Sequence, residues 1–301
     1  MTEVARPVSS VISDRALLAA EFALQRAGLR AVEAHDMTLL REVAELFGEV
    51  WGRNSEGLPM PSEVLRSLAH AGGLVTAGYD DATGALLGAA VLGRDEPGSA
   101  YGYIAAATPG SGDRGIGFAL KQHQRAWCLT RDITRIRWTF DPLVSRNARF
   151  NLSKLGAVVT TYEPAFYGRM SDALNGDDPA DRLVADWRLD SDRAVAAAEG
   201  ALMPPSGPPA ETDASGVGDE QDRGPDGLPA WRRSGAEAWC RVPTDIVELR
   251  RLEPATASAW RTQVRGRLTA AFDQGWIADG ANHQGWYHLT SPRTDGTGPS
   301  S

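Results

Sequence analysis

A glycine-rich turn between a strand-like and a helix-like segment constrains the fold of this chain more than any other feature. The turn reads PGSGDRGIG over residues 109–117. Small and aromatic residues typical of a strand precede it over 99–108. After the turn, apolar positions from Ile116 to Trp127 recur at helical spacing. A strand that passes through such a turn into a helix is typical of a phosphate-binding arrangement.

The turn has the features of a phosphate-binding site. Gly115 and Gly117 lack a Cβ atom, so a ligand can approach the backbone closely. Amides at the start of a helix point toward an anion, and the helix dipole favours negative charge there. Arg114 adds a charge-assisted contact. The motif alone is equally compatible with a turn that binds nothing. It lacks the Gly-x-Gly-x-x-Gly of dinucleotide-binding folds and the Gly-Lys-Ser/Thr of P-loops.

Strand and helix patterns continue on both sides of this turn. Asp36 is positioned to cap the helix that follows it. The segment DDATG separates two apolar runs and predicts a hairpin. We expect strands at 28–36, 74–79, 85–93, 99–108, 134–140, 157–163 and 181–189, and helices at 14–27, 36–52, 61–70, 116–127 and 145–157.

Residues 204–229 separate two foldable parts of the chain. They hold six of the 18 prolines, five glycines and six acidic residues against one arginine. Such a composition cannot bury a core, so it predicts a disordered acidic linker. Five of the nine tryptophans follow it, and a solvated tail would not hold so much aromatic surface. We therefore expect a core domain at 1–203 and a C-terminal extension at 230–301 that packs on it.

Two further stretches give the turn a context. DRGIGFALKQHQRAW, a strand, and then NARFNLSKLGA together resemble the GNAT superfamily of acyl-CoA-dependent N-acyltransferases. In that family Arg/Gln-x-x-Gly-x-Gly/Ala holds the CoA pyrophosphate, and Arg114, Gly117 and Ala119 match this pattern. Lys154–Ala157 match the family's Lys-Leu-Gly-Phe ending of a later helix. The stretches IRWTFDPL and YGRMSDALN are similar to a bacterial branch of the family.

The resemblance covers about two thirds of the chain and implies a fold class. From residue 28 to 190 the expected order is strand, two helices, three strands, helix, strand, helix and two strands, which is the order in this family. We therefore expect an α/β (α+β) GNAT fold with a mixed central sheet flanked by helices, followed by the linker-joined C-terminal extension.

The resemblance also implies an acyl-CoA site, with acetyl-CoA or another acyl-CoA as co-substrate and no metal. The strand before the turn would pair its backbone with the pantetheine arm. Asn147, Asn151 and Lys154 share a helix face at i, i+4 and i+7, which either meets the CoA or is solvated. The candidate cofactor-binding residues are Ala105, Ala107, Arg114, Gly115, Ile116, Gly117, Phe118, Ala119, Asn147 and Asn151.

The usual general acid of the family is absent. Many members have a Tyr four residues before the Gly of the helix ending, where it protonates the departing thiolate, but here that residue is Leu152. Tyr162 and Tyr167 are candidates for this role, with a buried structural Tyr as the alternative for each. Thiolate is a good leaving group, so water could also supply the proton. Asp141 ends a strand at the expected transfer point. It would be a general base if its environment raised its pKa, with a turn-capping Asp as the alternative.

Arg135 and Arg137 alternate with Ile136 and Trp138 and therefore share one face of a strand. Two guanidiniums beside the transfer point would be costly without an anionic partner. We therefore predict that they bind a carboxylate on the substrate or the acyl group. The alternative is that both side chains face solvent.

Charge and composition disfavour several other classes of protein. The net charge is −8, but the linker holds much of the acidic excess, so the rest shows no bias toward nucleic acid or membranes. No apolar run reaches the ~18 residues of a membrane span, and the start lacks the features of a signal peptide. Cys128 and Cys240 belong to no metal motif, which is typical of reduced thiols in a cytoplasmic protein. The five histidines form no triad.

The sequence thus predicts a cytoplasmic GNAT-fold N-acyltransferase that is a monomer or a homodimer. An acetyl or succinyl group would pass directly from CoA to the amine of a small molecule in a ternary complex. Proximity and a polarised thioester carbonyl would provide most of the rate enhancement. The alternative is a non-catalytic acyl-CoA-binding or regulatory protein with a degenerate site, which the missing Tyr favours. Nucleic-acid binding is disfavoured because the sequence has no basic aromatic face.

Overall fold

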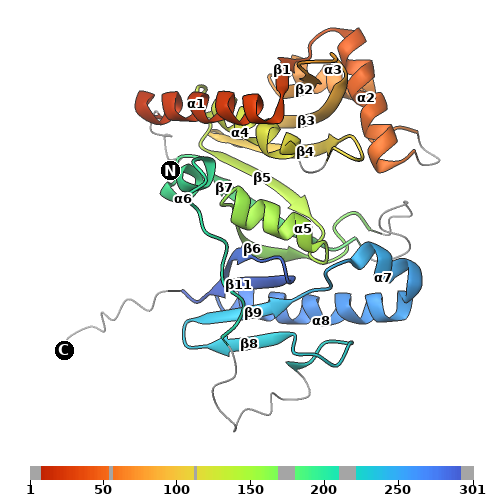
Figure 1. Ribbon diagram of the computed structural model, residues 1–301, viewed down its shortest axis with the longest axis vertical. Coiled ribbons are helices and arrows are strands. Elements are labelled where there is room, and N and C mark those ends of the chain that lie inside the picture. Colours follow the sequence, from red (N-terminus) through yellow and green to blue (C-terminus); the bar gives the residue numbers. More distant parts are fainter. Residues whose placement is uncertain (1–7, 54–56, 112–113, 169–179, 210–221, 293–301) are drawn as a thin grey trace.

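A mixed sheet of eleven strands runs through the described part of the protein (Figure 1). The computed structural model describes residues 8–53, 57–111, 114–168, 180–209 and 222–292. The strand order across the sheet is β1-β2-β3-β4-β5-β7-β6-β10-β11-β9-β8. The N-terminal half of the chain therefore occupies one end of the sheet and the C-terminal extension the other.

The elements up to residue 198 follow the order expected from the sequence, so the predicted fold class is confirmed. The chain adds only the short helix α6. The elements are α1 (Ser10–Ala27), β1 (Leu29–Glu33), α2 (Met37–Trp51), α3 (Ser62–His70), β2 (Leu74–Asp80), β3 (Leu86–Arg94), β4 (Ser99–Ala107), α4 (Ile116–Leu129), β5 (Arg135–Phe140), α5 (Ser145–Ala148), the π-helix η2 (Arg149–Lys154), β6 (Val158–Glu163), β7 (Arg182–Arg188) and α6 (Asp192–Ala198).

Local sequence signals explain several boundaries. The side chain of Asp36 accepts hydrogen bonds from the amides of Thr38 and Leu39, so it caps α2 as predicted. Gly28 ends α1 in the left-handed conformation that favours glycine. Helices cover both faces of the first four strands. Val75 and Ala89 belong to the core beneath α2 and α3, whereas residues of alternate register pack toward α1 and α4.

Strands β4 and β5 are parallel neighbours that pair at one end only. Ser99–Tyr101 pair with Arg135–Arg137, and no pair between the two strands follows. Gly102 and Trp138 are therefore the first residues beyond the last pair, where the strands diverge. We call this point the splay vertex. From Gly102 to Ala107 the backbone of β4 pairs with β3 on one side and is open toward β5 on the other.

The C-terminal extension continues the same sheet. Strand β10 lies antiparallel to β6, with Ala278 opposite Val159, and β11, β9 and β8 follow. Helix α8 packs against β6 and β9 (Figure 1). The extension consists of β8 (Trp231–Ser234), β9 (Glu237–Arg241), α7 (Ile246–Leu252), α8 (Pro254–Asp273), β10 (Ile277–Ala281) and β11 (Trp286–Thr290).

The end of the predicted linker is more ordered than its composition suggests. Residues 210–221 lie outside the described residues, but Asp222 forms an ion pair with Arg267 at 2.7 Å. Asp226 accepts two hydrogen bonds from Arg241, at 2.7 and 2.8 Å. The prediction of disorder fails over 222–229 because acidic residues can be held by arginines of the extension without an apolar core. The domain boundaries at 203 and 230 remain predictions.

Two features of the described residues bear on the class of protein. No helix among them combines the length and apolarity that a membrane crossing requires. They contain no cluster of three or more His, Cys, Asp or Glu side chains suited to a metal ion. Cys128 and Cys240 are both free and buried, and burial raises the pKa of each thiol to about 12.

Candidate acyl-CoA site at the splay of two strands

The glycine-rich turn leads directly into α4. Gly115 has a φ of 82°, a conformation that glycine adopts without strain. A Cβ atom on Gly115 would meet no atom within 4 Å, and one on Gly117 would meet only the Phe150 ring at 3.7 Å. Both glycines therefore leave open space above the first amides of α4, which have no partners within the helix. This geometry suits an anion such as a pyrophosphate.

The other residues of the motif divide between the surface and the core. Ile116 and Ala119 are buried and pack with α1 and β3, and Phe118 is half-buried. Their side chains hold the helix against the sheet. Any contact of this segment with a phosphate would therefore be made mainly by backbone amides.

Arg114 is engaged within the protein. It forms an ion pair with Asp80 at 2.7 Å and donates a hydrogen bond to the carbonyl of Ala27 at 2.9 Å. The hydrogen bond from Arg114, followed by those from Thr83, lowers the pKa of Asp80 to about 2. Arg114 thus ties the turn to the β2–β3 hairpin. Its side chain is still 42% exposed.

The open backbone of β4 leads from the splay vertex to the turn. Ala105 is exposed and Ala107 half-buried, and neither has a side chain that would obstruct the groove. An extended ligand with amide groups could pair with this edge as an added strand would. The expected pantetheine and pyrophosphate contacts are therefore contiguous along β4 and the start of α4.

One residue at the vertex was missed by the sequence analysis. Lys121 of α4 is only 8% exposed, and its Nζ atom lies 4.1 Å from the centroid of the Trp138 ring. A Cβ atom on Gly102 would be 3.7 Å from the same Nζ. The signal in the sequence was a lysine one turn after the Gly-rich motif, directly after the apolar residues of the first helical turn.

The helix that follows β5 is not the regular α-helix that its spacing predicts. After four residues, α5 passes into the π-helix η2, where the amide of Leu155 donates to the carbonyl of Phe150 five residues earlier. Asn151 is buried, whereas Asn147 is half-buried and Lys154 exposed. The predicted shared polar face is therefore wrong, because the extra residue per turn rotates the side chains around the axis.

Leu152 occupies the position where the family's Tyr is expected. It is fully buried in the main core, together with Leu155 and Ala148. Ser145, at the start of α5, donates a hydrogen bond to the carbonyl of Thr244 in the extension at 2.9 Å. The segment is thus anchored from both sides by packing and by the C-terminal extension.

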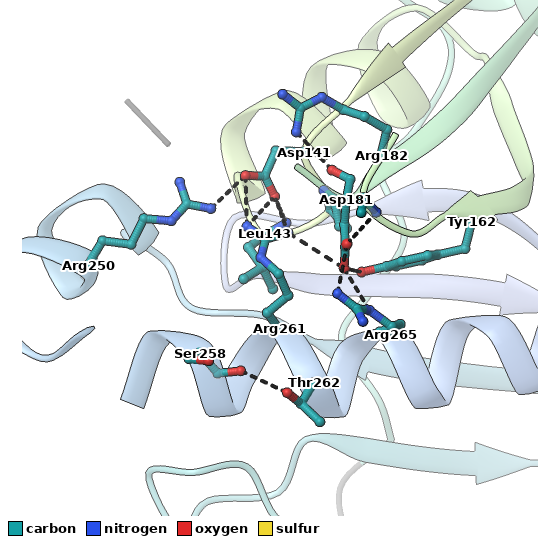
Figure 2. Close-up of polar contacts among 12 residues, drawn as sticks. Asp141, Leu143, Tyr162, Asp181, Arg182, Arg250, Ser258, Arg261, Thr262 and Arg265 are labelled. Atoms are coloured by element: carbon teal, nitrogen blue, oxygen red, sulfur yellow. Dashed lines mark hydrogen bonds and ion pairs between the residues drawn. The ribbon is translucent and has the colours of Figure 1, made fainter. Parts of the chain in front are cut away.

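Asp141 lies in a buried network of charges rather than in an open site (Figure 2). It forms ion pairs with Arg250 at 2.6 Å and Arg261 at 3.1 Å, and it accepts a hydrogen bond from the Leu143 amide. Burial raises the pKa of Asp141, but the two guanidiniums outweigh this effect and the net pKa is lowered. The condition for a general base, a raised pKa, is therefore not met.

The two candidate tyrosines differ in their surroundings. Tyr162 is buried and donates to Asp181 at 2.6 Å (Figure 2), and burial together with that carboxylate raises the pKa of its hydroxyl. Tyr167 is 49% exposed, and its hydroxyl lies 3.4 Å from that of Thr139 on the diverging part of β5. Of the two, only Tyr167 borders the splay.

Arg135 and Arg137 have anionic partners within the chain. Arg135 donates to both carboxylate oxygens of Asp186, at 2.8 and 2.5 Å. Arg137 donates to Asp95 at 2.6 Å. The argument that these arginines need a substrate carboxylate is therefore wrong, since the neighbouring strand and the β3–β4 turn supply the partners.

An aromatic patch borders the splay on the side opposite Trp138. Tyr101 and Tyr103 of β4 pack edge to face with ring centroids 5.3 Å apart, and Phe166 and Tyr167 pack in the same way at 4.7 Å. Burial raises the pKa of the Tyr101 hydroxyl. The hydrogen bond with Thr139 lowers this pKa and the contact with Tyr167 raises it, and the net pKa is raised. This patch was not expected from the sequence, because its members come from separate elements.

Comparisons with known proteins found only distant likenesses. No protein-family model and no curated protein matches the chain. Solved GNAT acetyltransferases match about half of it. The ribosomal-protein-S18-alanine N-acetyltransferase of Escherichia coli is 14% identical, with a TM-score of 0.44, and the match covers 54% of this chain and 94% of that one. The spermidine/spermine N-acetyltransferase SpeG of Vibrio cholerae is 14% identical, with a TM-score of 0.42 and coverage of 55% and 94%. At these values the likenesses carry no conclusion about activity or substrate.

Proposed function

We propose that this protein is an acyl-CoA-dependent N-acyltransferase of the GNAT type. The observation that supports this most is the continuity of two features: the open edge of β4 beyond the splay vertex, and the amide-lined glycine turn at the start of α4. An acyl-CoA needs both an extended partner for its pantetheine amides and an anion site for its pyrophosphate.

The acyl group, acetyl or succinyl, would lie near the splay vertex. The acceptor would approach over the aromatic patch of Tyr101, Tyr103, Phe166 and Tyr167. Holding thioester and amine together makes the transfer effectively unimolecular. The acceptor is proposed to be a small-molecule amine, and the aromatic rings favour one with an apolar or cationic part.

A second candidate function is non-catalytic acyl-CoA binding. Leu152 leaves the site without the expected Tyr, and Asp141 is held by two arginines. The first observation leaves the general acid unassigned, and the second argues against Asp141 as the base. A protein that binds acyl-CoA tightly but transfers its acyl group to no amine would fit this alternative.

The first test addresses CoA binding. Replacing Gly117 by Asp places a side chain and a negative charge over the first amides of α4, so we expect CoA binding to be abolished with the fold retained. Isothermal titration calorimetry with CoA measures this. Gly266→Asp is the matched control. Gly266 is exposed on α8 with open space around it, so this substitution adds the same charge far from the turn. Equal CoA affinity in wild type and Gly117→Asp would contradict the proposed site.

A further experiment separates the two candidate functions. Amino acids and other amines are incubated with acetyl-CoA and succinyl-CoA, and the products are analysed by mass spectrometry. Formation of an N-acylated product, lost in Gly117→Asp, supports the transferase. Tight binding of both acyl-CoAs without any product supports the non-catalytic alternative.

A further inference from the structure

The splay vertex holds a buried amine that neither the sequence motif nor the proposed function uses. Gly102 and Trp138 are the first residues after the last β4–β5 pair, and Lys121 reaches both of them from α4. The Trp138 ring lies below the Nζ atom, at 4.1 Å. The amine therefore stands where the open edge of β4 begins.

Lys121 has no charged partner among the residues that the structure describes. No carboxylate forms an ion pair with it there, and its recorded contact is the Trp138 ring. A buried lysine without a carboxylate is unusual, since desolvation of an ammonium is costly. Trp138 offers a π face but no hydrogen-bond acceptor, so the N–H donors of the ammonium remain available to a ligand.

The residue type at position 121 is itself informative in this chain. Only two of its 31 Lys and Arg residues are lysines, Lys121 and Lys154. Arginine stays protonated in proteins, whereas a buried lysine can give up its proton. Burial lowers the pKa of Lys121 to about 8, so the side chain is mainly an ammonium at neutral pH and can still release a proton. Lys121 is thus a basic residue of the type that can act as an acid.

We propose that Lys121 is the proton donor to the departing CoA thiolate, in the role left open by Leu152. This inference rests on the proposed acyl transfer. The acceptor amine attacks the thioester carbonyl, the C–S bond breaks, and the sulfur leaves with the electron pair. The Lys121 ammonium then transfers one proton to that sulfur. The acceptor nitrogen releases one proton to solvent, and the neutral lysine takes up one proton from solvent. The overall reaction therefore neither gains nor loses a proton.

Free CoA tests this without knowledge of the acceptor. If the ammonium faces the sulfur, it should stabilise the thiolate and lower the pKa of the bound CoA thiol by about 1–3 units. The thiolate is followed by its ultraviolet absorbance as the pH is raised, with desulfo-CoA as the reference complex. Of the other groups near Lys121, Gly102 and Trp138 do not titrate. The Cys128 thiol, whose pKa burial raises to about 12, stays protonated in this range.

Three variants separate charge from packing. Lys121→Met removes the charge at similar length and should abolish the shift, whereas Lys121→Arg keeps the charge and should retain it. Lys154→Met is the matched control, because Lys154 is exposed on η2, and it should behave like wild type. A wild-type complex with an unshifted thiol, or a shift that persists in Lys121→Met, overturns the role of Lys121 but leaves CoA binding intact. Absence of CoA binding in wild type overturns the proposed function as well.

A measurement on wild type covers the case in which Lys121→Met does not fold. With two lysines in the chain, NMR of lysine-labelled protein gives two side-chain signals, and Lys154→Met assigns them. The pKa of Lys121 should be higher in the CoA complex than in the desulfo-CoA complex, because a thiolate favours the ammonium. Equal values in the two complexes overturn the proposal.

Discussion

At the scale of single residues, partners decide what a side chain can do. Asp141 ends β5 beside the splay, where a general base was expected, but Arg250 and Arg261 hold it ionised. Arg261 is 2% exposed, so the pair is buried, and Asp181 with Arg265 extends the network (Figure 2). Asp141 therefore joins the extension to the core of the fold.

Replacing Asp141 by Asn should destabilise the protein. Removing one charge of a buried pair leaves the arginines uncompensated, and we expect the free energy of unfolding to fall by about 3 kcal/mol. Denaturant unfolding measures this. Glu199→Gln is the control, because it breaks an ion pair with Arg15 in which both side chains are about half exposed, and it should cost less than about 1 kcal/mol. A stable but inactive Asp141→Asn protein would restore Asp141 as the base.

At the scale of elements, the π-helix η2 determines which side chains face the groove. It places Asn151, Leu152 and Ser153 in the interior, and Ser153 exchanges hydrogen bonds with the backbone of Ala281 in β10 at 2.7 and 2.9 Å. The segment is therefore fixed between the core and the extension. A side chain at position 152 therefore points into the packed residues of the main core.

Restoring a Tyr at position 152 should therefore not restore a general acid. Leu152 is fully buried, so the larger ring of Leu152→Tyr should overpack the core and lower the free energy of unfolding by about 1–3 kcal/mol. Leu152→Met, which conserves volume, should cost less than about 1.5 kcal/mol. Thermal and denaturant unfolding compare the two. A Tyr variant that is as stable as wild type and faster in acyl transfer would show that the position does face the groove.

At the scale of the whole molecule, the extension is part of the fold. It pairs with β6 through β10, covers β6 with α8 and supplies arginines to both Asp141 and Asp181. Trp260, Tyr287 and Leu289 belong to the same core cluster as the residues of β5 and β7. Core and extension should therefore unfold together.

Cleavage of the chain between Gly216 and Val217 tests this. A site-specific protease sequence inserted there should yield two pieces that elute together in gel filtration and unfold in one calorimetric transition. The uncleaved insertion protein is the control. Pieces that separate under native conditions, or two transitions, would mean that the extension is an independent domain.

The sequence alone predicted much of the architecture because its signals are local. Periodic apolar positions, the Asp36 cap and the glycine turn each act within a few residues, so the order of elements from β1 to β7 followed from them. The candidate anion site at the start of α4 rests on equally local signals, since it needs only neighbouring amides and glycines, and it stays a prediction.

Only the tertiary structure decided how charged residues are used. Asp141, Arg135 and Arg137 have charged partners within the chain that local patterns did not predict, because Arg261, Asp186 and Asp95 come from other elements. Lys121 went unnoticed because its significance depends on two strands that part beside it. Local propensity fixes helices and strands, but the pairing and burial of a charge depend on which distant segments the fold brings together.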